Sequence, residues 1–198
     1  MPETTTADTA LPTGADLDVV DLLLAQHARI EELFLLVAGS TGQAKQGAFD
    51  DLVRLLAVHE TAEEELIHPL SRGLVDGGDA RVDDRLAEER QAKELLTTLI
   101  DADLDDAGFT TSLLLLRDAV LTHARYEERY EFNQLRAKVP AERLRALASA
   151  VRAAEALAPT RPHPSVNSAK ANLVAGPGLA VLDRVRDAVR QAVQRSRS

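Results

Sequence analysis

Four segments of this 198-residue chain place an apolar side chain at every third or fourth position, and this spacing limits the fold more than any other feature. Such spacing collects apolar residues on one face of an α-helix. The four stripes are Val20, Leu23, His27, Ile30, Phe34 and Val37; Leu52, Leu55, His59, Glu63, Leu66 and Leu70; Val82, Leu86, Glu89, Ala92, Leu96 and Leu99; and Leu113, Leu116, Val120, His123, Glu127 and Tyr130. Four helices joined by short connections predict an all-α, up-down-up-down four-helix bundle.

Helix boundaries follow from capping and breaking residues. The first helix is expected to begin near Asp16 or Asp18, both of a favourable N-cap type. The glycine-containing stretch "GSTGQAKQG" is expected to separate the first two helices, "SRGLVDGGD" to end the second and "DADLDDAG" to precede the fourth. Pro140 suits the first turn of another helix, "AERLRALASAVRAAEAL".

The sequence therefore predicts three regions. Residues 1–15 form a polar, disordered leader, residues 16–138 form the bundle, and residues 139–198 form a helical extension that packs on the bundle. Within the extension, an amphipathic segment from about Leu179 to Arg195 is expected to pack across the bundle, because it lacks the Trp or Phe of helices that bind a membrane surface.

Composition excludes several function classes. The absence of cysteine removes disulfides, iron–sulfur clusters and thiol nucleophiles, and it suits a reducing cytoplasm. A net charge of −9 argues against nucleic acid as a partner, because phosphate binding needs clustered Lys and Arg. No apolar run is long enough to cross a membrane, and the leader does not resemble a signal peptide. We therefore expect a cytoplasmic protein that binds neither membrane nor nucleic acid.

Histidine and glutamate interrupt the middle of each stripe. "HETAE" (residues 59–63) and "HARYE" (residues 123–127) each place a glutamate four residues after a histidine, on the same helical face. Unpaired charge in a core costs several kcal/mol per ion. Three histidines and three glutamates inside one bundle therefore need a common partner. A pair of metal ions supplies it.

These residues resemble the hemerythrin/HHE cation-binding family, a four-helix bundle that encloses two iron ions. "AQHARIEELF", "AVHETAEEEL" and "LTHARYEERYEF" match the family pattern on the first, second and fourth helices, and the resemblance covers about residues 16–137. It implies the metal ligands His27, His59, Glu63, His123 and Glu127, with Glu63 and Glu127 bridging two iron ions. Manganese or zinc also suits this combination of imidazole and carboxylate.

The third helix departs from the family pattern, which has a histidine there. Alignment on "KELL" (residues 93–96) places Glu89 at the histidine position, whereas a shift of one residue places Arg90 there. A guanidinium cannot bind a metal ion, and Glu89 lies on the inner stripe, so Glu89 is expected to be the sixth ligand. The alternatives are an open or otherwise supported position there, or a site that has lost a metal ion.

Five further residues are weaker candidates. Glu31 is expected on the solvated face, and Glu60 is a candidate partner of the ligands. His68 is expected at the surface or rim because it lies outside the inner stripe, and the alternative is that it contacts a metal ligand. Tyr130 lies on the inner stripe, where it either packs in the core or reaches a ligand. His163 in "RPHP" is expected to be structural.

Three functions remain open at this point. The resemblance implies binding, sensing or detoxification of O2, peroxide or NO at a non-heme di-iron centre. The high carboxylate content of the ligand set also suits an oxidase or peroxidase that acts on a small substrate. In the third alternative, the metal ions mainly stabilise a bundle that recruits a partner.

Overall fold

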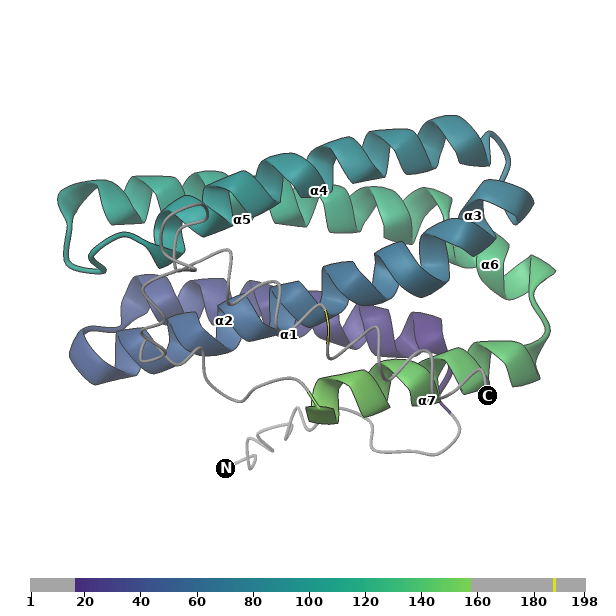
Figure 1. The fold of residues 1–198 in the computed structure, drawn as a ribbon, viewed down its shortest axis with the longest axis horizontal. Helices are drawn as coiled ribbons and strands as arrows, with labels where there is room; N and C mark the ends of the chain where they lie inside the picture. The colour runs from purple at the N-terminus through teal and green to yellow at the C-terminus, as the bar shows by residue number, and fades with distance from the viewer. Residues whose placement is uncertain (1–16, 158–186, 188–198) are drawn as a thin grey trace, which may run out of the picture.

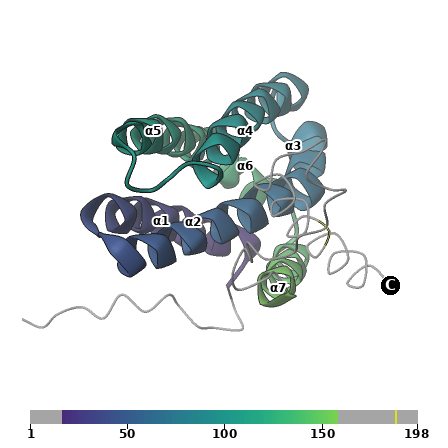
Figure 2. The ribbon, with the colours of Figure 1, turned by 60° about the vertical axis from the view of Figure 1, so that its left-hand side comes forward.

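A computed structural model describes residues 17–157 and Asp187, and the whole of this part of the chain except Asp187 folds into helices and short connections. The first layer pairs α1 (Val19–Gly39) with α2 (Gly42–Ala62). The second layer pairs α4 (Gly78–Ile100) with α5 (Ala107–Tyr130). Figures 1 and 2 show the two layers stacked with their axes roughly aligned, which confirms the four-helix bundle.

Shorter helices extend this frame at one end. α2 continues through a π-helical turn, η1 (Glu63–Ile67), into α3 (His68–Leu74), and these three elements together are called the second rod of the bundle. The fourth rod continues from α5 into α6 (Phe132–Lys138), and α7 (Ala141–Leu157) then packs against α1 and α2 (Figure 1). Among the described residues, no helix is long and apolar enough to cross a membrane.

Capping and glycine residues set the helix boundaries. Asp18 caps α1: its side chain accepts a hydrogen bond from the backbone N–H of Asp21, and the Asp21 side chain accepts one from the backbone N–H of Asp18. This reciprocal arrangement satisfies two N–H groups that a helix start leaves unpaired. Gly77, with φ of +69°, turns the chain between α3 and α4 in a conformation that other residues rarely adopt.

One expected connection is much shorter than its composition indicates. The stretch "GSTGQAKQG" was expected to form a loop, but α2 already begins at Gly42, so Ser40 and Thr41 alone separate it from α1. Glycine and polar residues are tolerated in the exposed first turns of α2, where they leave no buried side chain unsatisfied.

The core lies between the two layers and is almost entirely aliphatic. Its largest fully buried side chains come from every long helix: Leu23, Ile30, Leu33, Phe34, Leu52, Leu56, Leu96, Leu99, Phe109, Leu113 and Leu116. All the stripe residues expected from α1 are buried, which confirms that period. Buried polar residues interrupt this apolar core near the middle of the bundle.

The expected extension is described only up to Leu157. The helix expected after Pro140 is α7, which contacts α1 and α2. The leader at residues 1–15, the amphipathic segment from about Leu179 to Arg195 and His163 lie outside the described residues.

Candidate metal centre

Each long helix contributes a buried histidine or glutamate to the middle of the bundle. α1 contributes His27, α2 contributes His59, and η1 begins with Glu63. α4 contributes Glu89, and α5 contributes both His123 and Glu127. All six are at most 8% exposed. The structure therefore brings together every residue expected as a ligand, although their metal-binding role stays a prediction.

A first group of donor atoms gathers around the paired histidines. The Nε2 atoms of His27 and His59 lie 3.1 Å apart, and His59 Nε2 lies 3.1 Å from Glu63 Oε1. Glu127 Oε2 approaches His27 Nε2 to 3.5 Å. One donor atom from each of these four side chains lies within 4.8 Å of the others. Two imidazoles and two carboxylates at these separations form a possible cation site.

A second group shares Glu63 with the first. Its members are Glu63, Glu89 and His123, whose donor atoms also lie within 4.8 Å of one another. His123 Nε2 lies 3.7 Å from Glu63 Oε2 and 4.0 Å from Glu89 Oε1. It also lies 3.5 Å from Glu127 Oε2, so Glu127 faces both groups. Glu63 and Glu127 thus lie where carboxylates that bridge two ions would be needed.

Most of these donor atoms have no hydrogen-bond partner. Both carboxylate oxygens of Glu63 and of Glu127 are buried and unpartnered, and so are His123 Nε2 and Glu89 Oε2. Leaving a buried acceptor unsatisfied costs about 1–3 kcal/mol, and more for a charged group. A cation satisfies all these lone pairs at once, so the donor set fits a metal ion.

Outward-facing hydrogen bonds orient the three imidazoles. The Nδ1–H of His27 donates to Glu128 across 2.8 Å, and that of His123 donates to Glu88 across 3.1 Å. The Nδ1–H of His59 donates to the side-chain oxygen of Gln26 across 2.9 Å. These partners fix the tautomer in which Nε2 carries a lone pair toward the cluster, as in metal sites.

The hydrogen bond to His59 is part of a longer chain. The side-chain amide of Gln26 donates in turn to Glu155 on α7 across 2.9 Å. α7 therefore holds Gln26, the residue that orients the imidazole of His59. On the other side of His27, Phe132 stacks against the imidazole with ring centroids 5.7 Å apart.

Burial and mutual repulsion control the protonation of the cluster. Burial and the neighbouring Glu127 raise the pKa of Glu63 to about 8. Burial opposes protonation of His27, but the neighbouring carboxylates of Glu127 and Glu128 raise its pKa to about 9. Burial and the neighbouring His27 hold the pKa of His59 well below its usual range. Protons thus partly compensate the carboxylates in the way that a cation would.

A small cavity adjoins the donor atoms. It offers about 20 Å³ to the centre of a water-sized molecule. Its lining combines the polar residues His27, His59, Glu60, Glu88, Glu89 and His123 with the apolar residues Ile30, Leu56, Ala92, Val120, Leu121 and Ala124. A site of this size admits one water or a diatomic molecule. Glu60 is half-buried there, and burial together with Glu89 raises its pKa to about 8.

The expected position of His68 at the surface or rim was wrong. Its side chain is 3% exposed, and its Nε2 lies 2.5 Å from Glu89 Oε1. The stripe analysis assumed a regular α-helix, whereas η1 contains a π-helical turn that changes the direction of every later side chain. No feature of the sequence signalled this turn.

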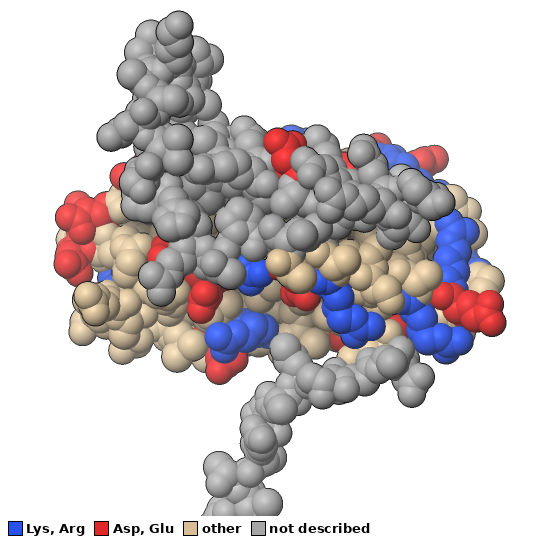
Figure 3. Space-filling view, turned by 60° about the horizontal axis from the view of Figure 1, so that its bottom comes forward, with Lys and Arg blue, Asp and Glu red and all other residues tan. Residues whose placement is uncertain are grey.

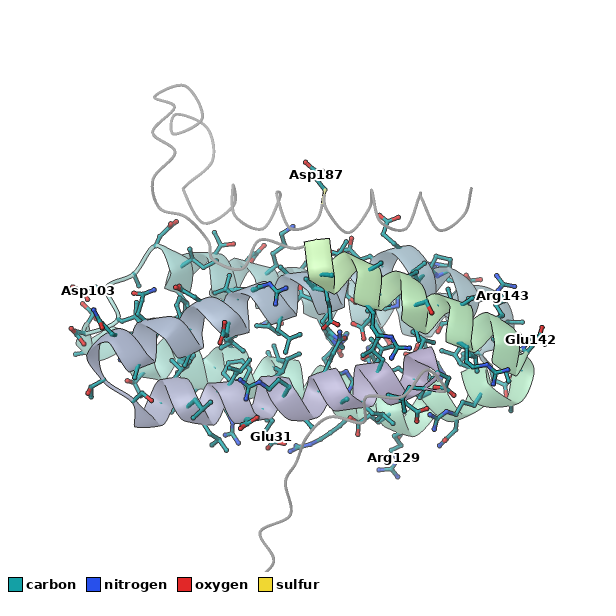
Figure 4. The ribbon with its side chains drawn as sticks, turned by 90° about the horizontal axis from the view of Figure 1, so that it is seen from below. Glu31, Asp103, Arg129, Glu142, Arg143 and Asp187 are labelled. Carbon is teal, nitrogen blue, oxygen red and sulfur yellow. The ribbon has the colours of Figure 1, made fainter. Side chains whose placement is uncertain are left out.

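Two expectations near the fourth helix also have clear outcomes. Tyr130 was expected on the inner stripe but is 36% exposed, whereas the two residues that follow it, Glu131 and Phe132, are buried. Glu31 was expected on the solvated face. It is 50% exposed and lies 3.8 Å from Arg117, and Figure 4 shows it on the outer side of α1.

The sequence did not reveal the residues that accept hydrogen bonds from the Nδ1–H groups of the three histidines. Gln26, Glu88 and Glu128 each lie next to a cluster residue in the sequence. Their positions beside His27, Glu89 and Glu127 are a weak signal, because a neighbour along a helix points about 100° away. Only the tertiary structure shows that each reaches the imidazole of another helix.

Comparison with known proteins identifies one relative by sequence and one by fold. A DNA nickase from Nostoc sp. (strain PCC 7120) is 26% identical over 141 residues, which span 71% of this chain but only 40% of that protein. The crystal structure of a hemerythrin HHE cation-binding domain-containing protein from Mycobacterium kansasii has the same fold, with a TM-score of 0.63. It is 18% identical, and the match covers 91% of this chain and 99% of that one.

Residues 18–135 match the family described as the hemerythrin HHE cation-binding domain. This match spans more than half of the chain and includes all six residues of the cluster. The protein therefore belongs to the hemerythrin HHE cation-binding domain family.

Proposed function

We propose that the protein binds two iron ions and that the loaded centre interacts with O2, peroxide or NO. The main support is the set of buried carboxylate and imidazole atoms without partners, divided into two groups that share Glu63. His27, His59, Glu63 and Glu127 would hold one ion, and Glu63, Glu89, His123 and Glu127 the other. Imidazole with carboxylate suits iron, and manganese or zinc is the alternative.

The cavity supports a small ligand rather than an organic substrate. Its volume of about 20 Å³ suits a diatomic molecule, whereas drug-sized ligands occupy pockets of about 300–1,000 Å³. Bound ferrous iron supplies electrons and an open coordination position to such a ligand. Leu56, Val120 and Leu121 line the cavity together with His59 and His123, so apolar side chains adjoin the donor atoms.

The carboxylates favour redox chemistry over simple carriage of oxygen. Three glutamates place negative charge around the ions, and negative charge stabilises iron in its higher oxidation states. Glu60 adds a half-buried carboxyl at the cavity whose pKa is raised to about 8 by burial and by Glu89. Detoxification of peroxide is consistent with these properties.

Anaerobic reconstitution with ferrous iron tests the proposal. We expect about two iron ions per chain, as in di-iron bundles, and an optical change after O2, peroxide or NO is added. A reversible change indicates binding or sensing, whereas decay with turnover indicates an enzyme. Absence of bound iron would refute the proposal. Bound iron without a response to any of the three ligands would favour the metal-stabilised scaffold.

DNA nicking is not carried over from the Nostoc relative. This chain matches only 40% of that protein, and its net charge is −9. On the face shown in Figure 3, the visible basic side chains are interspersed with acidic ones rather than gathered into one basic area. Binding to phosphates needs clustered positive charge.

A further inference from the structure

The π-helical turn η1 changes which residues of the second rod face the cluster. His59 and Glu63 are four residues apart, the spacing that aligns side chains on an α-helix. Glu63 and His68 are five apart, which in an α-helix would turn His68 about 140° away. In η1 the backbone N–H of His68 donates to the carbonyl of Glu63 instead, so five residues complete the turn. All three side chains consequently face the bundle interior.

His68 contacts one member of the second group of donor atoms, Glu89. Its Nε2 lies 2.5 Å from Glu89 Oε1, and Glu89 belongs to the group with Glu63 and His123. His68 is 3% exposed and Glu89 is 5% exposed. His68 Nδ1 and Glu89 Oε2 are both buried without a hydrogen-bond partner. Each of these two buried side chains therefore keeps one polar atom that has no hydrogen-bond partner.

The two groups of donor atoms are unequal without His68. The first contains the imidazoles of His27 and His59, whereas the second contains one imidazole, that of His123. Adding His68 gives each group two imidazoles around the shared Glu63. Two donor atoms bound side by side to one ion at about 2.1 Å each lie about 3 Å apart. The contact of 2.5 Å between His68 and Glu89 is within half an ångström of that separation.

We propose that His68 is a metal ligand and that it replaces, from the second rod, the imidazole that α4 lacks at Glu89. His68, Glu89 and His123 then hold the second ion together with Glu63. The π-helical turn is the structural device that brings His68 to the site. This inference rests on the proposed function, because it requires the cluster to bind metal.

Cobalt(II) binding to the full-length protein tests the role of His68. In the wild type labelled with nitrogen-15 histidine, we expect four imidazoles with cobalt-shifted resonances: His27, His59, His68 and His123. Three shifted imidazoles would overturn the inference without any variant being needed. This count separates a ligand from a histidine that only hydrogen-bonds to Glu89, because only a bound imidazole takes up large unpaired spin density.

His68→Gln gives the second measurement. Glutamine retains an N–H donor for Glu89 but supplies no imidazole nitrogen. We expect the first cobalt equivalent to bind as in the wild type and the second to bind at least tenfold more weakly, with one shifted imidazole lost. His163→Gln is the matched control, with an expected titration like that of the wild type. Unchanged binding and spectra in His68→Gln would reject His68 as a ligand.

The two proposals fail in different ways. If the wild type binds neither cobalt nor iron, the proposed function fails and the inference fails with it. If the wild type binds two equivalents and His68→Gln does the same with unchanged spectra, only the inference fails. Circular dichroism before titration identifies a variant that does not fold, and the count of shifted imidazoles in the wild type then decides the question.

Discussion

The Nε2 atoms of His27 and His59 face each other across 3.1 Å, although the two residues come from different helices. Each Nδ1–H donates outward, to Glu128 from His27 and to Gln26 from His59. Both inner nitrogens therefore direct lone pairs toward the same space when the imidazoles are neutral. A cation bound to both nitrogens removes this conflict. In the metal-free protein, the neighbouring carboxylates of Glu127 and Glu128 raise the pKa of His27 to about 9, so its protonation removes the conflict instead.

Replacing either of two cluster histidines should remove about half of the bound metal or more. His59→Ala removes a donor of the first group, and His123→Ala removes one of the second. We expect iron per chain to fall from about two to about one or less in each variant, since each ion loses an imidazole. Colorimetric iron analysis after anaerobic reconstitution and desalting measures this loss.

The stability of the same variants provides an independent measure. A ligand that binds only the folded state stabilises it by about 2.7 kcal/mol at one hundred times its Kd. The wild type should therefore gain thermal stability when iron is added, and His59→Ala should gain much less. An equal rise of Tm in both proteins would contradict the assignment of His59 as a ligand.

α7 should influence metal affinity through Glu155. Glu155 accepts a hydrogen bond from Gln26, which holds the Nδ1–H of His59. Loss of such outer partners costs about 10–100-fold in metal affinity. We expect Glu155→Ala to weaken the first metal equivalent within this range, as measured by competition with a chelator.

Glu142→Ala is the matched control for Glu155→Ala. Glu142 lies on the same helix, is exposed, and is drawn at the outside of the molecule in Figure 4. This variant should bind metal like the wild type. If both variants lose affinity equally, the effect arises from the stability of α7 rather than from the hydrogen bonds that lead to His59.

Asp18 should make the start of α1 sensitive to acid. Partial burial raises its pKa, but hydrogen bonds from Arg136 and from the backbone of Asp21 outweigh burial, so the pKa lies below the usual range. A carboxylate with a lowered pKa stabilises the folded state above its unfolded pKa of about 4 and loses this effect as the pH falls through the folded value.

The corresponding variants separate the cap from the ion pair. Asp18→Ala should lower the free energy of unfolding by about 1 kcal/mol at pH 7, the usual effect of losing an N-cap. Asp18→Asn retains a capping side chain but loses the charge opposite Arg136, so its loss should be smaller. Urea unfolding at pH 7 and at pH 3 measures both. A difference between wild type and Asp18→Ala that grows on acidification would contradict this account.

The sequence was sufficient to predict the bundle because periodicity is a local property. Stripes such as Leu23–His27–Ile30 and Val120–His123–Glu127 bury the same face along a regular helix, and their interruptions identified all six residues of the cluster. Glu89 was placed by alignment of "KELL" with the family pattern and by its position on the stripe with Leu86 and Leu96. The stripe positions themselves needed only a constant rotation per residue.

The prediction for His68 was wrong because it crossed a break in this rotation, the π-helical turn η1, which turns His68 inward. Tyr130 was also misplaced: it ends α5 and is 36% exposed, whereas the next residue, Glu131, is buried. The partners of the imidazoles could not be predicted from any single helix, because Glu88, Gln26 and Glu128 each bind a residue of another helix.

Exchanging the carboxylate of Glu89 for an imidazole should change how the centre responds to oxygen. Glu89→His removes one negative charge beside His123 and leaves less stabilisation for oxidised iron. We expect this variant to retain about two iron ions, as in di-iron bundles, and to show an optical change that reverses more fully when oxygen is removed. Glu89→Gln, which removes the charge without adding an imidazole, should bind the second ion more weakly. Optical spectra of Glu89→His identical to those of the wild type, through cycles of oxygen addition and removal, would mean that Glu89 does not act at the metal ions.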